Sequence, residues 1–139
     1  MAASRLFLKE IKQASQLREN FAFETTLSGK SYLKLIHDLQ VGGWLVELIY
    51  LYLPDVQLSI ERVAERVKHG GHNIPLESII RRYPRSLHNL VNDYAPLCDT
   101  VICLDNSQEQ EKIIFLQNHQ GIIVKDQLVY QKMTGVKQP

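Results

Sequence analysis

The 139-residue sequence has little cysteine, no excess of either charge and no long apolar run. Cys98 and Cys103 are its two cysteines, which indicates reduced thiols rather than a disulfide framework. Sixteen Lys and Arg balance fifteen Asp and Glu, and this balance argues against a basic nucleic-acid-binding protein. Glu47 and Asp55 bracket the longest apolar run, which is far below the ~18 residues of a membrane helix. These absences, with an N-terminus that lacks a signal-peptide core, predict a single cytoplasmic domain that binds neither nucleic acid nor membranes.

Apolar periodicity predicts alternating helices and strands. Helices are expected at 3–18, 30–40, 56–69 and 76–94, and Pro84 is expected to kink or break the last one. Strands are expected at 21–27, 44–53 and 99–104, with a hairpin within 121–133 that turns near Lys125-Asp126. This order predicts an α/β domain with a largely parallel sheet and flanking helices. Ligands of such sheets bind beyond the C-terminal ends of the strands.

A short glycine motif follows the first predicted strand. Ser28-Gly29-Lys30-Ser31 imitates the end of the P-loop motif G-x-x-x-x-G-K-[ST], but the position of the first glycine is Glu24. The alternative is a glycine turn into a helix whose first amides attract an anion.

Glu24 and Thr25-Thr26 stand at the end of that predicted strand. A carboxylate at this edge of a sheet can accept the proton of a substrate hydroxyl or hold a sugar hydroxyl. The alternative is an exposed glutamate beside two threonines that favour extended backbone.

Residues 62–85 contain six basic and two acidic side chains. Arginines three or four apart on one helix repel each other, and a bound phosphate would relieve that repulsion. The alternative is a solvated basic face. His69 and His72 lack the further ligands that a zinc site needs, so no metal site is predicted. The basic residues are Arg62, Arg66, Lys68, Arg81, Arg82 and Arg85.

Three colinear stretches together resemble the zeta-toxin-like group of P-loop small-molecule kinases. They are FAFETTLSGKSYLKLI, LYLPDVQLSIERVAERVKHGGHNIPLESIIRRYPRSLHNL and the DNS at 105–107. The resemblance implies a P-loop kinase-like fold over 1–139, with a C-terminal hairpin and a lid at about 62–85. It also implies an incomplete domain, truncated at the N-terminus, because the Walker A segment of the family has no counterpart in this sequence.

The resemblance also assigns roles to residues. It implies that Glu24 and Thr26 face the acceptor. Nucleotide phosphates would be bound by Arg66 and Arg82, by Arg81 or Arg85 in addition, and by the lid loop that contains His72. Asp105, Asn106 and Ser107 would lie near the nucleotide.

In the intact family the reaction is ATP- and Mg²⁺-dependent phosphoryl transfer to a hydroxyl acceptor, with nucleotide sugars as one candidate class. The resemblance therefore implies a fragment or degenerate kinase that is inactive as this chain and binds neither ATP nor Mg²⁺ tightly. The alternative is a non-catalytic protein that binds a phosphorylated ligand or a protein through its arginine lid. Expected partners are a nucleotide or phosphorylated small molecule, an antitoxin, or a second copy through open sheet edges.

Overall fold

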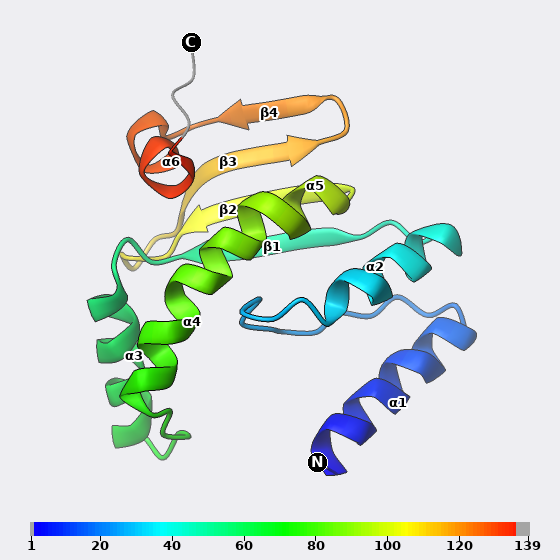
Figure 1. The fold of residues 1–139 in the computed structure, drawn as a ribbon, viewed down its shortest axis with the longest axis horizontal. Coiled ribbons are helices and arrows are strands. Elements are labelled where there is room, and N and C mark those ends of the chain that lie inside the picture. The colour runs from blue at the N-terminus through cyan, green and yellow to red at the C-terminus, as the bar shows by residue number, and fades with distance from the viewer. Residues whose placement is uncertain (1, 136–139) are drawn as a thin grey trace.

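A four-stranded sheet organises the computed structural model, which describes residues 2–135 (Figure 1). Its strands lie in the order β1 (Glu47–Tyr52), β2 (Thr100–Asp105), β3 (Lys112–Asn118) and β4 (Gly121–Val124). β1 and β2 are parallel, whereas β2 with β3 and β3 with β4 are antiparallel. The α/β class is thus confirmed, and the sheet is mixed rather than largely parallel.

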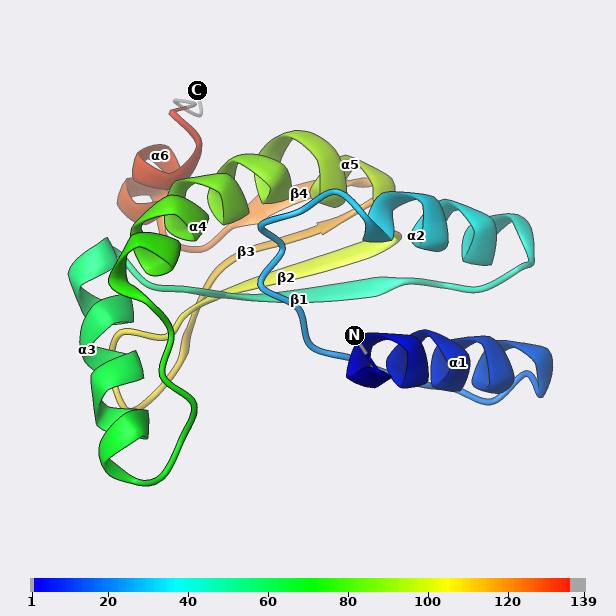
Figure 2. The ribbon, with the colours of Figure 1, turned by 60° about the horizontal axis from the view of Figure 1, so that its bottom comes forward.

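The helices lie mainly on one face of this sheet. In Figure 2, α4, α5 and α6 cover that face, and α1 lies on the other side of the plane of β1. The helical elements of residues 2–135 are α1 (Ala2–Gln16), α2 (Tyr32–Val41), α3 (Val56–Lys68), α4 (Leu76–Asn89), the π-helical η1 (Leu90–Tyr94), α5 (Ala95–Leu97) and α6 (Gln127–Thr134). None of the helices within 2–135 is long and apolar enough to cross a membrane.

The predicted helix boundaries are confirmed where local chemistry sets them. Asp55 caps α3, because its Oδ1 accepts a hydrogen bond from the Leu58 N–H at 3.0 Å. Gly70 ends the same helix with φ +85°, a conformation that glycine adopts without strain. The expected break at Pro84 is wrong, since α4 continues through it and the irregular turn occurs later, in η1. Pro84 is exposed, so water can satisfy the carbonyl that it leaves unbonded.

The strand expected at 21–27 is wrong. These residues are extended, but the four strands of the sheet do not include them. Their aromatic side chains pack into the body of the protein instead: Phe21 contacts Trp44, and Phe23 contacts Tyr32. The segment therefore has the extended backbone that its composition favours without a strand partner.

The hairpin is present but lies upstream of its predicted position. It joins β3 to β4 and turns at 119–120. Residues 127–134, expected as its second strand, form α6, because Asp126 caps that helix by accepting a hydrogen bond from the Val129 N–H at 3.1 Å. β-branched residues near this turn favour a strand, but the Asp126 cap stabilises a helix at this position.

The core lies between the sheet and the α4–η1–α5 rod. Leu90 and Tyr94 of η1 and Cys103 and Ile114 of the sheet are 0% exposed. Both cysteines are free and buried, and burial raises the pKa of the Cys103 thiol to about 12. The opposite face of β1 is open and exposes Ile49 and Leu51.

Candidate functional site

A pocket of about 190 Å³ lies where the C-terminal half of β1 meets α3 and α4. We call it the Arg82 pocket, because Arg82 is the only charged side chain among the residues that line it. Thr26 lines the same pocket, so the structure brings together one predicted acceptor residue and one predicted phosphate-binding residue. The other polar side chains of the lining are Tyr50, Ser59, Tyr83 and Ser86.

The hydroxyl groups of this pocket are neutral. Tyr50 Oη lies 3.0 Å from Ser86 Oγ, and Tyr83 Oη donates to the carbonyl of Leu53. Burial is the main cause that raises the pKa of both Tyr50 and Tyr83, so both phenols keep their protons at neutral pH. A guanidinium among neutral hydroxyl groups is suited to bind an anion such as phosphate.

Two side chains of the α4–η1 rod hold the segment that presents Thr26. Asn89 is buried and donates from Nδ2 to the Leu27 carbonyl at 2.9 Å, and Tyr94 Oη donates to the Gly29 carbonyl at 2.8 Å. Leu27 itself has φ +61°, which turns the chain at this point. Neither hydrogen bond could be predicted from local sequence, although a polar residue such as Asn89 on a buried helix face indicates that a hydrogen-bond partner lies nearby.

Lys30, from the P-loop-like Ser28–Ser31 sequence, is engaged elsewhere. Its Nζ lies 3.5 Å from the Asp93 carboxylate, so η1 holds this lysine as well. The motif thus forms the turn into α2.

Glu24 lines a larger groove of about 600 Å³ that continues from the Arg82 pocket. Residues 22–27 form one wall of this groove and residues 47–51 of β1 form the other. We call it the β1 groove. It shares Thr26, Tyr50, Leu51 and Ser86 with the Arg82 pocket, so the two predicted acceptor residues, Glu24 and Thr26, lie along one continuous depression.

The other predicted lid residues lie outside the Arg82 pocket. They are exposed and lie on α3, on α4 and in the loop between these helices. Gly71 shapes that loop, because a Cβ atom there would meet the Arg66 carbonyl oxygen at 2.7 Å. Besides Arg66, the predicted lid residues outside the Arg82 pocket are His72, Arg81 and Arg85.

Asp105, Asn106 and Ser107 are half-buried where β2 ends. Asp105 Oδ1 accepts a hydrogen bond from the Ser107 N–H at 3.0 Å. Arg62 Nη2 donates to the Asn106 carbonyl at 2.6 Å, so this arginine of the basic cluster ties α3 to the end of β2. Asp105 and Ser107 also line a polar pocket of about 190 Å³ with Lys112.

Within residues 2–135, no group of three or more His, Cys, Asp or Glu side chains could hold a metal ion.

The arrangement is that of an α/β domain with an arginine-containing pocket at the C-terminal end of β1. The family model for Zeta toxin matches residues 1–120, which include every element through β3. The chain therefore belongs to the zeta toxin family.

An uncharacterized protein of Haemophilus influenzae is 35% identical to this chain over 63 residues. The match covers 45% of this chain and 45% of that protein, so the chain spans less than half the length of this relative. No solved structure gives a significant match.

Proposed function

We propose that the chain is the acceptor-and-lid part of a zeta-toxin-type kinase, which transfers a phosphoryl group from ATP to a hydroxyl group of a small molecule. The observation that supports this most is the Arg82 pocket, where one guanidinium stands among neutral hydroxyl groups. A guanidinium binds two phosphate oxygens through parallel N–H···O bonds. Membership of the zeta toxin family supports ATP as the phosphoryl donor.

Each part of the depression has a role in this proposal. Arg82 binds phosphate, while Thr26 and Glu24 face the acceptor, for which nucleotide sugars are one candidate class. Glu24 is exposed and able to accept the hydroxyl proton. The exposed lid residues Arg66, His72, Arg81 and Arg85 add phosphate contacts when nucleotide is bound. Asp105, Asn106 and Ser107 lie on the nucleotide side.

The 139 residues contain no G-x-x-x-x-G-K-[ST] sequence. The amides and lysine of that loop, together with Mg²⁺, position the phosphates in enzymes of this kind. We therefore expect these residues alone to bind ATP·Mg²⁺ weakly and to turn it over no faster than buffer. Steady ATP consumption that disappears in Arg82→Ala would contradict this expectation.

Calorimetric titration with ATP tests the proposed phosphate contact. Arg82→Ala should weaken binding about tenfold or more, because it removes the charge from the pocket. Lys34→Ala is the control, since it removes an exposed positive charge that does not line the pocket and has no role in the proposal. Equal losses in the two variants would refute the assignment of the pocket, and an unaffected Arg82→Ala would do the same.

A further inference from the structure

Arg62 differs from the other arginines of the basic cluster because its guanidinium is bonded to the end of the sheet. It is half-buried, and its Nη2 donates to the Asn106 carbonyl at 2.6 Å, across 44 positions of the sequence. It forms no ion pair within residues 2–135, and it does not line the Arg82 pocket. This donor is therefore committed to the backbone of the protein and not to a ligand site.

Asn106 joins the ends of two strands. Its N–H donates at 2.9 Å to the carbonyl of Tyr52, the last residue of β1, and it directly follows Asp105, the last residue of β2. On its other side, the Ser107 N–H donates to Asp105 Oδ1. Because this turn is held on both sides of Asn106, the bond from Arg62 connects α3 and the turn as one unit.

The helical spacing of α3 determines which other side chain Arg62 orients. Ser59, Arg62 and Arg66 are three, four and seven positions apart, and residues at these spacings lie on one face of a helix. Ser59 lines the Arg82 pocket. The rotation of α3 that brings Arg62 to Asn106 therefore also places Arg66 on the side of the helix that meets the pocket.

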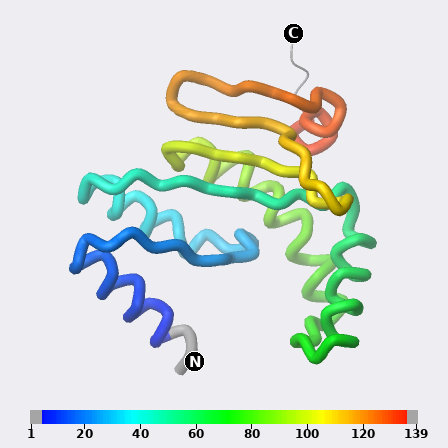
Figure 3. Tube along the Cα trace, turned by 180° about the vertical axis from the view of Figure 1, so that it is seen from behind, coloured from blue at the N-terminus to red at the C-terminus, as the bar shows by residue number. Residues whose placement is uncertain are grey.

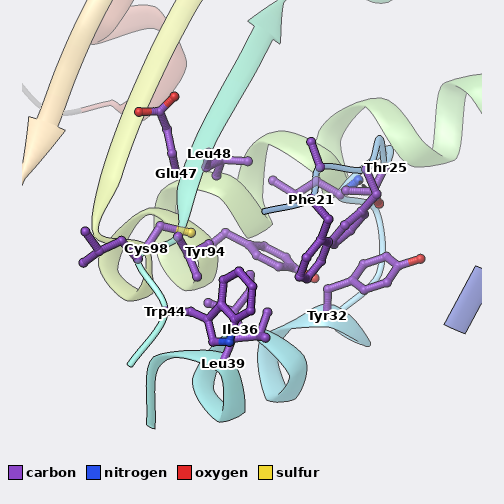
Figure 4. Close-up of a pocket in the computed structure, with 15 residues that line it drawn as sticks. Phe21, Thr25, Tyr32, Ile36, Leu39, Trp44, Glu47, Leu48, Tyr94 and Cys98 are labelled. Carbon is purple, nitrogen blue, oxygen red and sulfur yellow. Dashed lines mark hydrogen bonds between the residues drawn. The ribbon is translucent and has the colours of Figure 1, made fainter. Parts of the chain in front are cut away.

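Arg66 is free to bind a ligand. It is exposed, and no ion pair or side-chain hydrogen bond engages its guanidinium within the described residues. Glu65, its neighbour in the sequence, pairs with Lys68 and His69 instead. The aromatic pocket of about 170 Å³ around Trp44, at the start of β1, has no basic side chain in its lining and so lacks a charged partner for phosphate (Figure 4).

The second lid helix, α4, is held to the sheet in the same manner. Tyr83 Oη donates to the Leu53 carbonyl at the end of β1, and Arg82 directly precedes this tyrosine. Figure 3 shows α3 and α4 extending side by side away from the ends of β1 and β2. Each helix thus has one side chain bonded to a strand end, Arg62 or Tyr83, and one unpaired arginine near it, Arg66 or Arg82.

We propose that Arg62 is a positioning residue, which couples α3 to the turn at 105–107 and thereby holds Arg66 in the orientation that binds phosphate. The phosphate contact of Arg66 rests on the proposed function, whereas the coupling of α3 to the turn does not. Arg62 itself makes no contact with the ligand.

Hydrogen exchange of the nucleotide-free chain tests the coupling. Arg62→Gln removes the charged donor, and should speed exchange of the amides at 63–68 and of Asn106 and Ser107 about tenfold relative to the β2 amides. Lys68→Gln is the matched control, because it removes an exposed positive charge from the same helix and keeps the bond to Asn106. Unchanged exchange at Asn106 and Ser107 in Arg62→Gln would overturn the inference.

A double-mutant cycle with ATP tests the orientation of Arg66. Calorimetry should show that Arg62→Gln weakens ATP binding about fivefold in the wild-type background, and less than about twofold when Arg66→Ala is already present. Additive losses would mean that Arg62 acts independently of Arg66, and would overturn the positioning role. A purely structural role would lower the melting temperature without this dependence on Arg66.

The two measurements also separate the inference from the proposed function. If Arg66→Ala leaves the ATP affinity unchanged, the proposed phosphate contact of the lid fails, and hydrogen exchange still shows whether Arg62 couples α3 to the turn. If Arg62→Gln does not fold, Arg62→Met takes its place, because methionine keeps the apolar packing of the side-chain stem and lacks the donor. The same results are expected of it, and the same results would overturn the inference.

Discussion

β1 has two extended, apolar neighbours, and only one of them is a strand. β2 pairs with it in parallel over six residue pairs. Residues 21–27 run along its other edge without pairing. Hydrogen bonds from side chains of distant segments account for this difference in pairing. Asp99 accepts a hydrogen bond from the Val46 N–H at 2.7 Å and fixes the start of β2 against β1, whereas Asn89 and Tyr94 fix the other segment to the helical rod.

This difference shows that composition decides whether backbone is extended, while distant contacts decide whether it pairs. Both segments are rich in β-branched and aromatic residues, which favour extended backbone. Pairing also requires a partner at strand spacing, and that condition lies outside the local sequence. The paired side of β1 should therefore dominate stability, and the groove side should be more tolerant of change.

The largest expected effect comes from the paired side. Ile114→Ala in β3 removes a side chain that is 0% exposed, and should lower the free energy of unfolding by about 2–5 kcal/mol. Ile49→Ala on the open face of β1 should cost less than about 1 kcal/mol, because little buried volume is lost. Urea unfolding of both variants measures this contrast, and similar losses would show that the open face is covered in solution.

A smaller effect is expected where the unpaired segment is held. Asn89→Ala leaves the Leu27 carbonyl without its buried donor, and should cost about 1–3 kcal/mol. It should also speed hydrogen exchange of the amides in residues 21–28 relative to those of β2. The control is Asn92→Ala, an exposed side chain whose bonds stay within its own helix turn, with His88. Should both variants exchange and unfold alike, Asn89 is not the anchor.

The helices could be predicted from sequence because their signals are local. The cap at Asp55 and the glycine at Gly70 act within one turn, and both lie where the pattern placed them. The strand at 21–27 and the position of the hairpin could not be predicted, since both depend on which segment lies alongside. The cap at Asp126, which redirects 127–134 into α6, was a local signal that β-branched neighbours obscured.

The candidate site, like the fold, could be predicted only in part from local sequence. Residue types alone pointed to Glu24 with Thr25-Thr26 and to the arginine cluster, and the resemblance then singled out Thr26 for the acceptor and Arg82 for phosphate. Their common pocket depends on the fold, which places residues 26 and 82 along the same cavity. Tyr83 and Asn89, which shape and support that site, were not predicted, because their roles are visible only once α4 is packed against β1.

The smallest expected effect is a pH dependence at the anchor of β2. Asp99 accepts hydrogen bonds from His119 at 2.9 Å, from the Val46 N–H at 2.7 Å and from Gln40 at 3.2 Å. The bond from His119 is the largest cause that lowers the pKa of the Asp99 carboxyl, and the Val46 amide is the next. A carboxyl whose pKa is lower in the folded state contributes stability above its unfolded pKa of about 3.9. That contribution is lost as the pH falls through the folded pKa.

Asp99→Asn removes the titrating group and keeps one oxygen acceptor for Val46. Wild type should therefore be more stable than Asp99→Asn at pH 6, and the difference should shrink as the pH is lowered below about 4. Urea midpoints from pH 6 to pH 2.5 measure it, with the exposed Asp38→Asn as the reference for an equal change in net charge. A difference between wild type and Asp99→Asn that stays constant over this range would mean that the charge of Asp99 does not hold β2 against β1, and the contrast between the two edges would then rest on packing alone.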